Sequence, residues 1–286
     1  PSKGLRKDGI MKKRIRPGTV LYWSAAIIWF LAAAFPLYFT FISSFKDNSQ
    51  IFSAFLIPSL RPVFDNYVMA QKMAGILKAT ANSLFVSGSA IAIMLLFCTM
   101  AAYVTARKRV PFASAVSGLL IAALMIPIQS AIVPIVQMVS SLGLKNRLWT
   151  LTIIYAGLNM ALVFFIMKNY IEGIPSDLDE AAMIDGCSLT KIVMLVIMPV
   201  AKPAMATCAI ITFLFTYNEL PIANVLINDK SLRTISVALL SLKGDFGVLY
   251  SVIFAAIMIS LVPTVTIYLL AQEKVEKSIA SGMVKG

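Results

Sequence analysis

The sequence predicts an all-α integral membrane protein with six transmembrane helices and both termini on the cytoplasmic side. Composition is the first reason, because 59% of the 286 residues are hydrophobic and only 13% are charged. A typical soluble domain has about a quarter of its residues charged. The second reason is a series of charge-free runs, most of them as long as the ~20 residues that cross a bilayer. The third is the clustering of Lys and Arg between these runs, which sets orientation.

Charge and residue types exclude several functions. The net charge is +12, and we assign the excess to cytoplasmic loops. Nucleic-acid binding is the alternative, but the basic residues lie in short loops between apolar runs, so we expect no nucleic-acid partner. The chain has no His, the commonest metal ligand and general base. Its three Cys form no C-x-x-C pair, so the sequence predicts neither a zinc site nor a disulfide framework.

The first third of the chain contains one span and one outer segment. Residues 1–16 are a basic cytoplasmic N-terminus, followed by a charge-free run from Pro17 to Phe45 that we interpret as the first span. Pro36 is expected to kink it. Residues 46–78 form a mixed outer segment, in which an amphipathic helix is expected to start at Asp65.

The second and third spans follow. Residues 79–106 are charge-free and end at a basic cluster, 107–109, which marks the inside. The next charge-free run, 110–144, is too long for one straight span. We expect Pro127 and Pro134 to divide it into a helix and a kinked or partly unwound end. Irregular backbone within a membrane lines a cavity or is buried in protein, so Gln129 and Gln137 are candidate pathway residues; the alternative is that they lie at the outer interface.

Three further spans complete the expected topology. The fourth is 148–167 and carries one strong polar group, Asn159; the fifth begins with 203–218; the sixth is 246–272. Residues 273–286 form a cytoplasmic tail. With this assignment 16 of the 25 basic residues lie inside, which supports an even number of spans.

The polar loop at 169–202 reads as two short helices joined at a glycine. Ser176 is expected to cap the first helix, with Asp179 reaching back in a capping box. Gly186 can adopt the left-handed conformation that ends a helix. Ser188 is expected to cap a second helix through Val196, and Pro199 marks a break. One face of the first helix follows the i, i+3, i+4, i+7 rule, with Leu178, Ala181, Ala182 and Asp185.

This loop resembles the EAA loop of ATP-binding-cassette importer permeases. Its Glu180-Ala181-Ala182, three residues, Gly186, nine residues, then Val196-Ile197-Met198-Pro199 follow E-A-A-x3-G-x9-I-x-L-P with mild apolar swaps. The alternative is an ordinary amphipathic surface helix. The resemblance implies the type I importer permease fold, a permease domain over 17–272, and a coupling helix that docks on an ATPase. It also implies that the residues that couple this chain to the ATPase are Glu180, Ala181, Ala182, Asp185, Gly186 and Pro199.

Other stretches resemble sugar-importer permeases of the maltose type. These are PSLRPVFDNY with the later Asn82-Ser83-Leu84, the cluster at 217–221, and the VKG ending of the tail, which in one subunit type reaches the ATPase interface. A disordered terminus is the alternative for the tail.

The cluster at 217–221 is a candidate sugar site. A carboxylate in hydrocarbon costs about 3 kcal/mol, so Glu219 should face a cavity, a cation or the interface. Glu219 and Asn218 can hydrogen-bond hydroxyl groups while the Tyr217 ring packs on C–H faces. The alternative is a structural pair that caps the end of the fifth helix or binds a partner subunit. Asn159 and Gln129 complete the candidate pathway.

The sequence contains no recognisable ATP-binding motif that could drive transport. Its nearest P-loop match, Gly4 to Gly9, is followed by Ile10 where the phosphate-binding Lys should be. We therefore expect a transport subunit rather than an enzyme, which binds no cofactor or metal itself and relies on partner ATPases for ATP and Mg²⁺.

The resemblance implies one of two permeases of a bacterial carbohydrate importer in the cytoplasmic membrane. The expected partners are a second permease, two ATPase subunits, an extracytoplasmic solute-binding protein, membrane lipid and a sugar or oligosaccharide. The alternatives are an ion-coupled secondary transporter, a permease for another small solute, and a membrane-embedded enzyme, for which the catalytic groups are missing.

Overall fold

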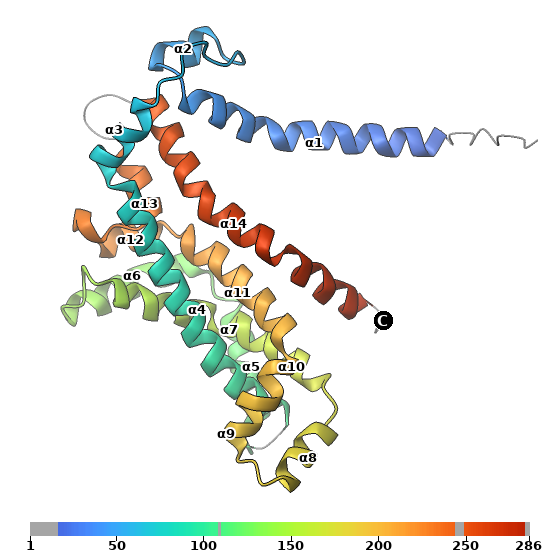
Figure 1. Ribbon diagram of the computed structural model, residues 1–286. Helices are drawn as coiled ribbons and strands as arrows, with labels where there is room; N and C mark the ends of the chain where they lie inside the picture. Colours follow the sequence, from blue (N-terminus) through green and yellow to red (C-terminus); the bar gives the residue numbers. More distant parts are fainter. Residues whose placement is uncertain (1–16, 108–109, 244–248, 284–286) are drawn as a thin grey trace, which may run out of the picture.

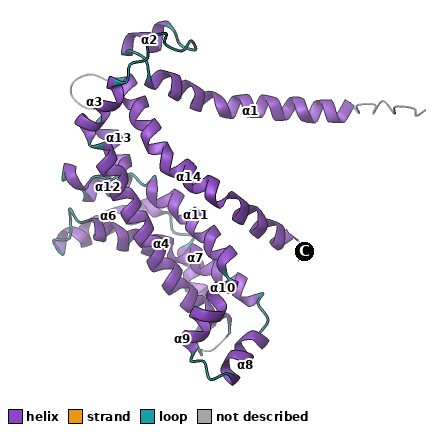
Figure 2. Cartoon of the chain, in the orientation of Figure 1, coloured by secondary structure: helices purple, strands orange, loops and turns teal. Residues whose placement is uncertain are grey.

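The computed structural model describes residues 17–107, 110–243 and 249–283, and within these ranges the chain forms helices and loops but no strand (Figures 1 and 2). The elements, in chain order, are α1 (Pro17–Ser44), α2 (Asn48–Ser53), α3 (Asp65–Ala74), α4 (Ile76–Ala106), α5 (Ala113–Ala123), α6 (Ile128–Ser141), α7 (Leu148–Glu172), α8 (Asp177–Ile184), α9 (Leu189–Ile192), the π-helix η1 (Val193–Ile197), α10 (Met198–Val200), α11 (Lys202–Tyr217), α12 (Pro221–Leu226), the 3₁₀-helix η2 (Lys230–Leu232), α13 (Ile235–Ser241) and α14 (Tyr250–Met283).

Four helices in the described ranges, within α1, α4, α7 and α14, are long and apolar enough to cross a membrane. Two bent pairs have the same character: α5 with α6, which meet at 99°, and the α9–α10 helix with α11, which meet at 80°. Counting each bent pair as one crossing makes six spans, the number that the sequence predicts. The all-α membrane architecture is therefore confirmed.

The core lies where α4 runs along α7. Met94 and Tyr103 of α4 and Tyr155 and Phe164 of α7 are all buried in one cluster. Small residues let the backbones approach, as is usual between membrane helices. A second cluster joins α3, α11, α13 and α14, and includes Tyr217. These two clusters hold the middle of the chain together and leave the long outer faces apolar and exposed.

Helix α1 projects away from the rest of the molecule in Figure 1 and meets it near the start of α14. Trp29 is 78% exposed and most of α1 is similarly uncovered. Water would disfavour such a surface, whereas lipid chains are as apolar as Leu. The exposure of α1 is thus consistent with a helix that faces lipid or another membrane subunit.

A fully buried lysine organises the outer segment, which the sequence did not predict. Lys46 is 0% exposed, and its Nζ donates to the carbonyl oxygens of Ala54 at 2.8 Å and Phe55 at 3.1 Å. Asn66 Nδ2 donates to the carbonyls of Ser44 and Lys46, each at 2.9 Å. Burial lowers the pKa of Lys46. The amphipathic helix expected from Asp65 is confirmed as α3.

The third span differs from the prediction. Its second half is a 14-residue helix, α6, turned sharply from α5, rather than a kinked or unwound end. Pro127 lies at the division between the halves as predicted, as the N-cap of α6 after α5 ends at Ala123, but Pro134 lies inside α6 and does not divide it. A proline in the second turn removes only one internal hydrogen bond, which explains why the helix continues.

Two helix ends also differ from the prediction. Helix α7 continues past Met167 to Glu172, and α14 continues past Gln272 to Met283. The expected start of the sixth span at Phe246 lies outside the described residues, as do the N-terminal segment 1–16 and the VKG ending at 284–286.

Candidate functional site

The polar loop forms a separate lobe at the end of the molecule, below the ends of α4 and α7 in Figure 1. Helix α8 occupies its tip, and Gly186 follows with φ +76°. The predicted left-handed glycine is therefore confirmed. A Cβ at Gly186 would meet no atom within 4 Å, so the reason for glycine is backbone conformation rather than space.

The predicted capping box is wrong. Ser176 is the N-cap of α8 but makes no side-chain cap hydrogen bond. The Asp179 carboxylate points away from Ser176, is 2% exposed, and accepts a 2.6 Å hydrogen bond from Arg107 Nε at the end of α4. Arg107 Nη2 also donates to the Ile174 carbonyl at 3.0 Å. A charge-assisted bond to a cation is stronger than a neutral cap, and it wins here.

The α8 residues that the sequence predicts for coupling lie on two different faces of the helix. Ala182 is 8% exposed and packs into the core, whereas Glu180, Ala181 and Asp185 are exposed. The buried face therefore passes through Asp179 and Ala182. Another protein can approach the opposite face at Ala181, where the side chain is small.

The tip of α8 presents apolar side chains to solvent. Ile184 is 87% exposed, and Leu178 and Met183 are exposed by 41% and 40%. Three large apolar side chains are thus exposed on one eight-residue helix, and exposed apolar surface is common at interaction sites. We call these three residues the α8 patch.

The second half of the loop is more continuous than predicted. The chain runs helically from Leu189 to Val200, with a π-helical turn at Val193–Ile197, and Ser188 makes no side-chain cap bond. Pro199 lies within this helix and is not the break. The bend occurs at Ala201, before Lys202 and Pro203 start α11. Proline in a first helical turn is tolerated because its missing N–H would be unpaired there.

Glu219 forms the centre of the second candidate site. Its Oε2 accepts from the Tyr155 hydroxyl at 2.5 Å and from the Ala223 N–H at 3.0 Å, and its Oε1 accepts from the Ile222 N–H at 2.7 Å. The two backbone donors belong to the first turn of α12, where a negative charge is favoured by the helix dipole. Glu219 thus caps α12, and not the end of α11.

The other candidate pathway residues do not converge on Glu219. Tyr217 is 1% exposed and donates to the Ser260 carbonyl of α14 at 3.2 Å. Asn218 is exposed and donates to Leu214 O within α11, and Asn159 donates to Tyr155 O within α7. Gln129 is exposed in the first turn of α6. Tyr155 is the partner that sequence reasoning missed, and nothing local in the sequence indicates it.

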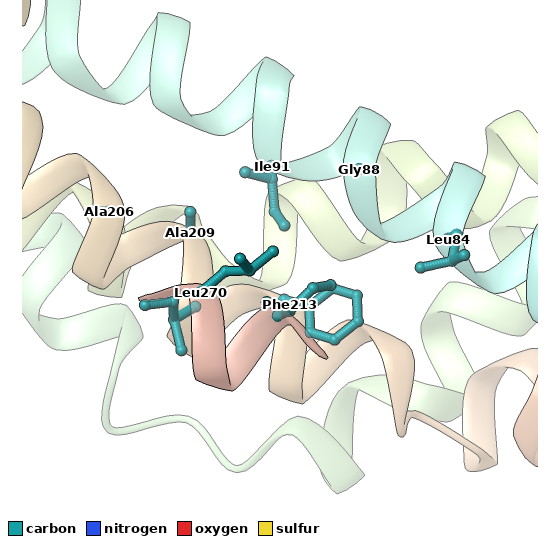
Figure 3. A pocket seen from close by; sticks show the side chains of 9 residues that line it. Leu84, Gly88, Ile91, Ala206, Ala209, Phe213 and Leu270 are labelled. Atoms are coloured by element: carbon teal, nitrogen blue, oxygen red, sulfur yellow. The ribbon is translucent and has the colours of Figure 1, made fainter. Parts of the chain in front are cut away.

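An apolar groove of about 420 Å³ lies between α4, α11 and α14 (Figure 3). Leu84, Gly88 and Ile91 contribute from α4, with Ala206 and Ala209 from α11 and Leu270 from α14. None of the candidate pathway residues lines this groove. Its apolar surface suits a hydrocarbon chain or an apolar helix better than a polyhydroxyl solute.

Residues 95–281 match the family described as binding-protein-dependent transport system inner membrane component. The match covers more than half of the chain, so the protein belongs to this family and is a permease subunit of the ABC importer type. Such subunits are transport components rather than enzymes.

Particular relatives extend the match to nearly the whole chain. The chain is 31% identical to the probable ABC transporter permease protein YurM of Bacillus subtilis, covering 94% of this chain and 89% of that protein. It is 31% identical to the diacetylchitobiose uptake system permease protein NgcG of Streptomyces coelicolor, covering 90% and 85%.

A solved structure shows the same fold. It is a bacterial ABC transporter involved in the import of the acidic polysaccharide alginate, with a TM-score of 0.78, 21% identity, and coverage of 89% of this chain and 95% of that one. The importer permease fold that the EAA-like loop implies is therefore confirmed.

Proposed function

We propose that this chain is the permease subunit of an ATP-driven importer for sugars or oligosaccharides. The observation that carries the proposal is the substrate type of its relatives. Similar permeases are named for diacetylchitobiose, for starch degradation products and for galactooligosaccharides, each aligned over at least 87% of this chain. An importer for another small solute is the second candidate, and a panel of solutes distinguishes the two.

In this proposal the α8 lobe couples the chain to an ATPase. The exposed Glu180, Ala181 and Asp185 and the α8 patch provide the docking surface. Gly186 and Pro199 shape the loop behind them. ATP and Mg²⁺ bind in the two partner ATPase subunits, and their closure moves the lobe. This chain contributes no cofactor site of its own.

The translocation pathway forms with a second, homologous permease. Exposed amides at Asn218 and Gln129 are available to substrate hydroxyl groups. The Glu219 oxygens are occupied by three internal hydrogen bonds, so Glu219 shapes the pathway through α12. Asn159 and Tyr217 support the same region from α7 and α11.

The remaining partners follow from the family. An extracytoplasmic solute-binding protein delivers the substrate, and the assembly sits in lipid in the bacterial cytoplasmic membrane with both termini inside. The C-terminal tail, whose last residues lie outside the described ranges, contacts the ATPase pair. The solved complex of an alginate transporter with a pentasaccharide-bound periplasmic protein has the same fold, with a TM-score of 0.59.

Uptake in proteoliposomes tests the function. The complete transporter, with its second permease, ATPase subunits and binding protein, is expected to take up a radiolabelled oligosaccharide only when ATP is present on the side of the membrane that carries the ATPase subunits. Uptake by this chain alone under a proton or sodium gradient, insensitive to ATP, would instead establish a secondary transporter. Accumulation of other solutes but no sugar would overturn the substrate class.

A further inference from the structure

An ion pair between Arg107 and Asp179 joins the α8 lobe to the end of α4. Arg107 is the C-cap of α4, and its side chain is 12% exposed, while that of Asp179 is 2% exposed. The two residues lie 72 positions apart in the chain. The same guanidinium donates to the Ile174 carbonyl, in the turn between α7 and α8. Arg107 therefore holds both the helix α8 and the turn that leads into it.

The burial of this pair makes it a stiff connection. Exposed ion pairs are screened and fluctuate, and they contribute little. A buried carboxylate that loses its cation is left as an uncompensated charge, which is strongly unfavourable. Breaking this ion pair is consequently unfavourable in free energy. A connection that transmits a displacement from one helix to another must resist breaking in this way.

The path beyond Arg107 is also packed. Helix α4 shares its largest buried cluster with α7, including Tyr103, four residues before Arg107, and Phe164. A displacement of α8 therefore reaches α4 through Arg107 and α7 through the turn at Ile174. Mechanical coupling between the α8 lobe and the membrane helices requires a structural element that moves as a unit.

We propose that Arg107 and Asp179 form the link that makes α8 and α4 move together during transport. Arg107 is then a positioning residue, because it acts through Asp179 and contacts neither nucleotide nor substrate. The inference rests on the proposed role of α8 in coupling. It adds a defined mechanical route from that helix into the membrane.

Distance measurements test the link without reference to transport. Spin labels are placed at exposed Ala101 of α4 and at exposed Asp177 of α8, which is outside the proposed docking surface. The labelled chain, with its three native cysteines replaced by alanine, is assembled into the complete transporter in nanodiscs. We expect one narrow distance distribution with and without nucleotide. Arg107→Ala and Asp179→Asn are expected to broaden it. An unchanged narrow distribution in both variants would overturn the proposal.

Coupling is measured on the unlabelled proteins. Arg107→Ala and Asp179→Asn are expected to keep ATPase binding and hydrolysis but to lower uptake per ATP by roughly tenfold. The swap Arg107→Asp with Asp179→Arg is expected to restore part of the loss. Lys168→Ala, which removes a partly exposed 2.8 Å pair with Glu172 inside α7, is the matched control and is expected to change neither readout.

The two readouts separate this inference from the function on which it rests. If single variants broaden the distance while the wild-type transporter imports no sugar, the link holds and the substrate proposal fails. If uptake per ATP stays at the wild-type level in both single variants that assemble, the link is not used. Loss of assembly in Arg107→Ala that the swap does not restore would indicate a structural role only.

Discussion

The Tyr155 hydroxyl donates a 2.5 Å hydrogen bond to Glu219 Oε2, and this contact joins the middle of α7 to the start of α12. The same carboxylate accepts the first free N–H groups of α12. A helix leaves its first N–H groups without hydrogen-bond partners inside the helix. The Glu219 side chain accepts hydrogen bonds from these groups in α12 and also holds α12 against the core. The following predictions begin with this pair.

Glu219→Gln is expected to weaken the cap of α12. A carboxamide has one accepting oxygen, whereas Glu219 accepts bonds through both. Losing an acceptor for a half-buried donor costs about 1–3 kcal/mol. Thermal unfolding of the purified chain should show lower stability, with transport reduced and ATPase assembly kept. Asn218→Ala, at the exposed neighbouring position, is the control for the unfolding measurement only; equal stability of Glu219→Gln and wild type would contradict the assignment.

Tyr155→Phe should act through the same bond. Removing the hydroxyl deletes one hydrogen bond, worth about 1 kcal/mol, and keeps the buried ring. The double variant with Glu219→Gln is expected to cost less than the sum of the single variants, because the shared bond can be lost only once. Additive unfolding energies in this cycle would show that the two side chains act independently.

Gly186→Ala is expected to cost about 1–2 kcal/mol, because a side chain disfavours the left-handed region. The space around the Cβ is empty, so Gly186→Asn should cost less and Gly186→Val more. Uncoupling, measured as ATP hydrolysed per solute transported, should follow the same order. Normal uptake by Gly186→Val would argue against a shaped coupling loop.

Ala181 and Ala182 provide a matched pair on α8. Ala182 is 8% exposed, so Ala182→Leu overpacks the core at a cost of about 1–3 kcal/mol. Ala181 is exposed, so Ala181→Leu should leave the stability of this chain unchanged and weaken ATPase binding by steric clash. Thermal unfolding and co-purification separate the two effects. A similar result for both variants would contradict the burial pattern.

Lys46 gives a pH dependence with a defined sign. Burial lowers its pKa below the ordinary 10.5, so the unfolded chain binds more protons than the folded chain between the two values. Stability should therefore rise with pH through that window. A neutral amine still has two N–H groups for the carbonyls of Ala54 and Phe55.

Lys46→Met is the reference for this measurement because it keeps an unbranched side chain that is only one atom shorter and cannot titrate. Melting temperatures of both proteins are compared from neutral pH to about pH 10.5, so that other titrating groups cancel. The difference should shift in favour of the wild type as pH rises. A constant difference would mean that Lys46 has the same pKa in the folded and unfolded chains.

Much of the fold follows from local patterns. Charge-free length predicts the spans because a bilayer excludes unpaired charge, and these spans agree with the helices to within about five residues, except at the C-terminal end of α14. Gly186 and Pro127 are read correctly because a left-handed turn and a missing N–H are properties of one residue. The EAA-like spacing indicates the family because it lies within one short, continuous segment of the chain.

Local sequence patterns fail where the same residues at the same spacing are compatible with two different structures. Ser176 and Asp179 have the spacing of a capping box, yet the carboxylate bonds a cation that lies 72 residues earlier. Pro199 has the chemistry of a helix breaker, yet it lies within the helix from Leu189 to Val200, and the bend falls at Ala201. Only the packed chain decides between such alternatives, because the competing partner comes from another helix.

The sequence by itself therefore determined the class of protein, its apolar spans and the position of the polar loop that we propose as the coupling loop. Tertiary structure alone decided which polar groups meet: Arg107 with Asp179, and Tyr155 with Glu219, 64 residues apart. The physical reason is that apolar length and turn chemistry act along the chain. A buried hydrogen bond depends on how α4, α7 and α11 pack, and no local pattern encodes that arrangement.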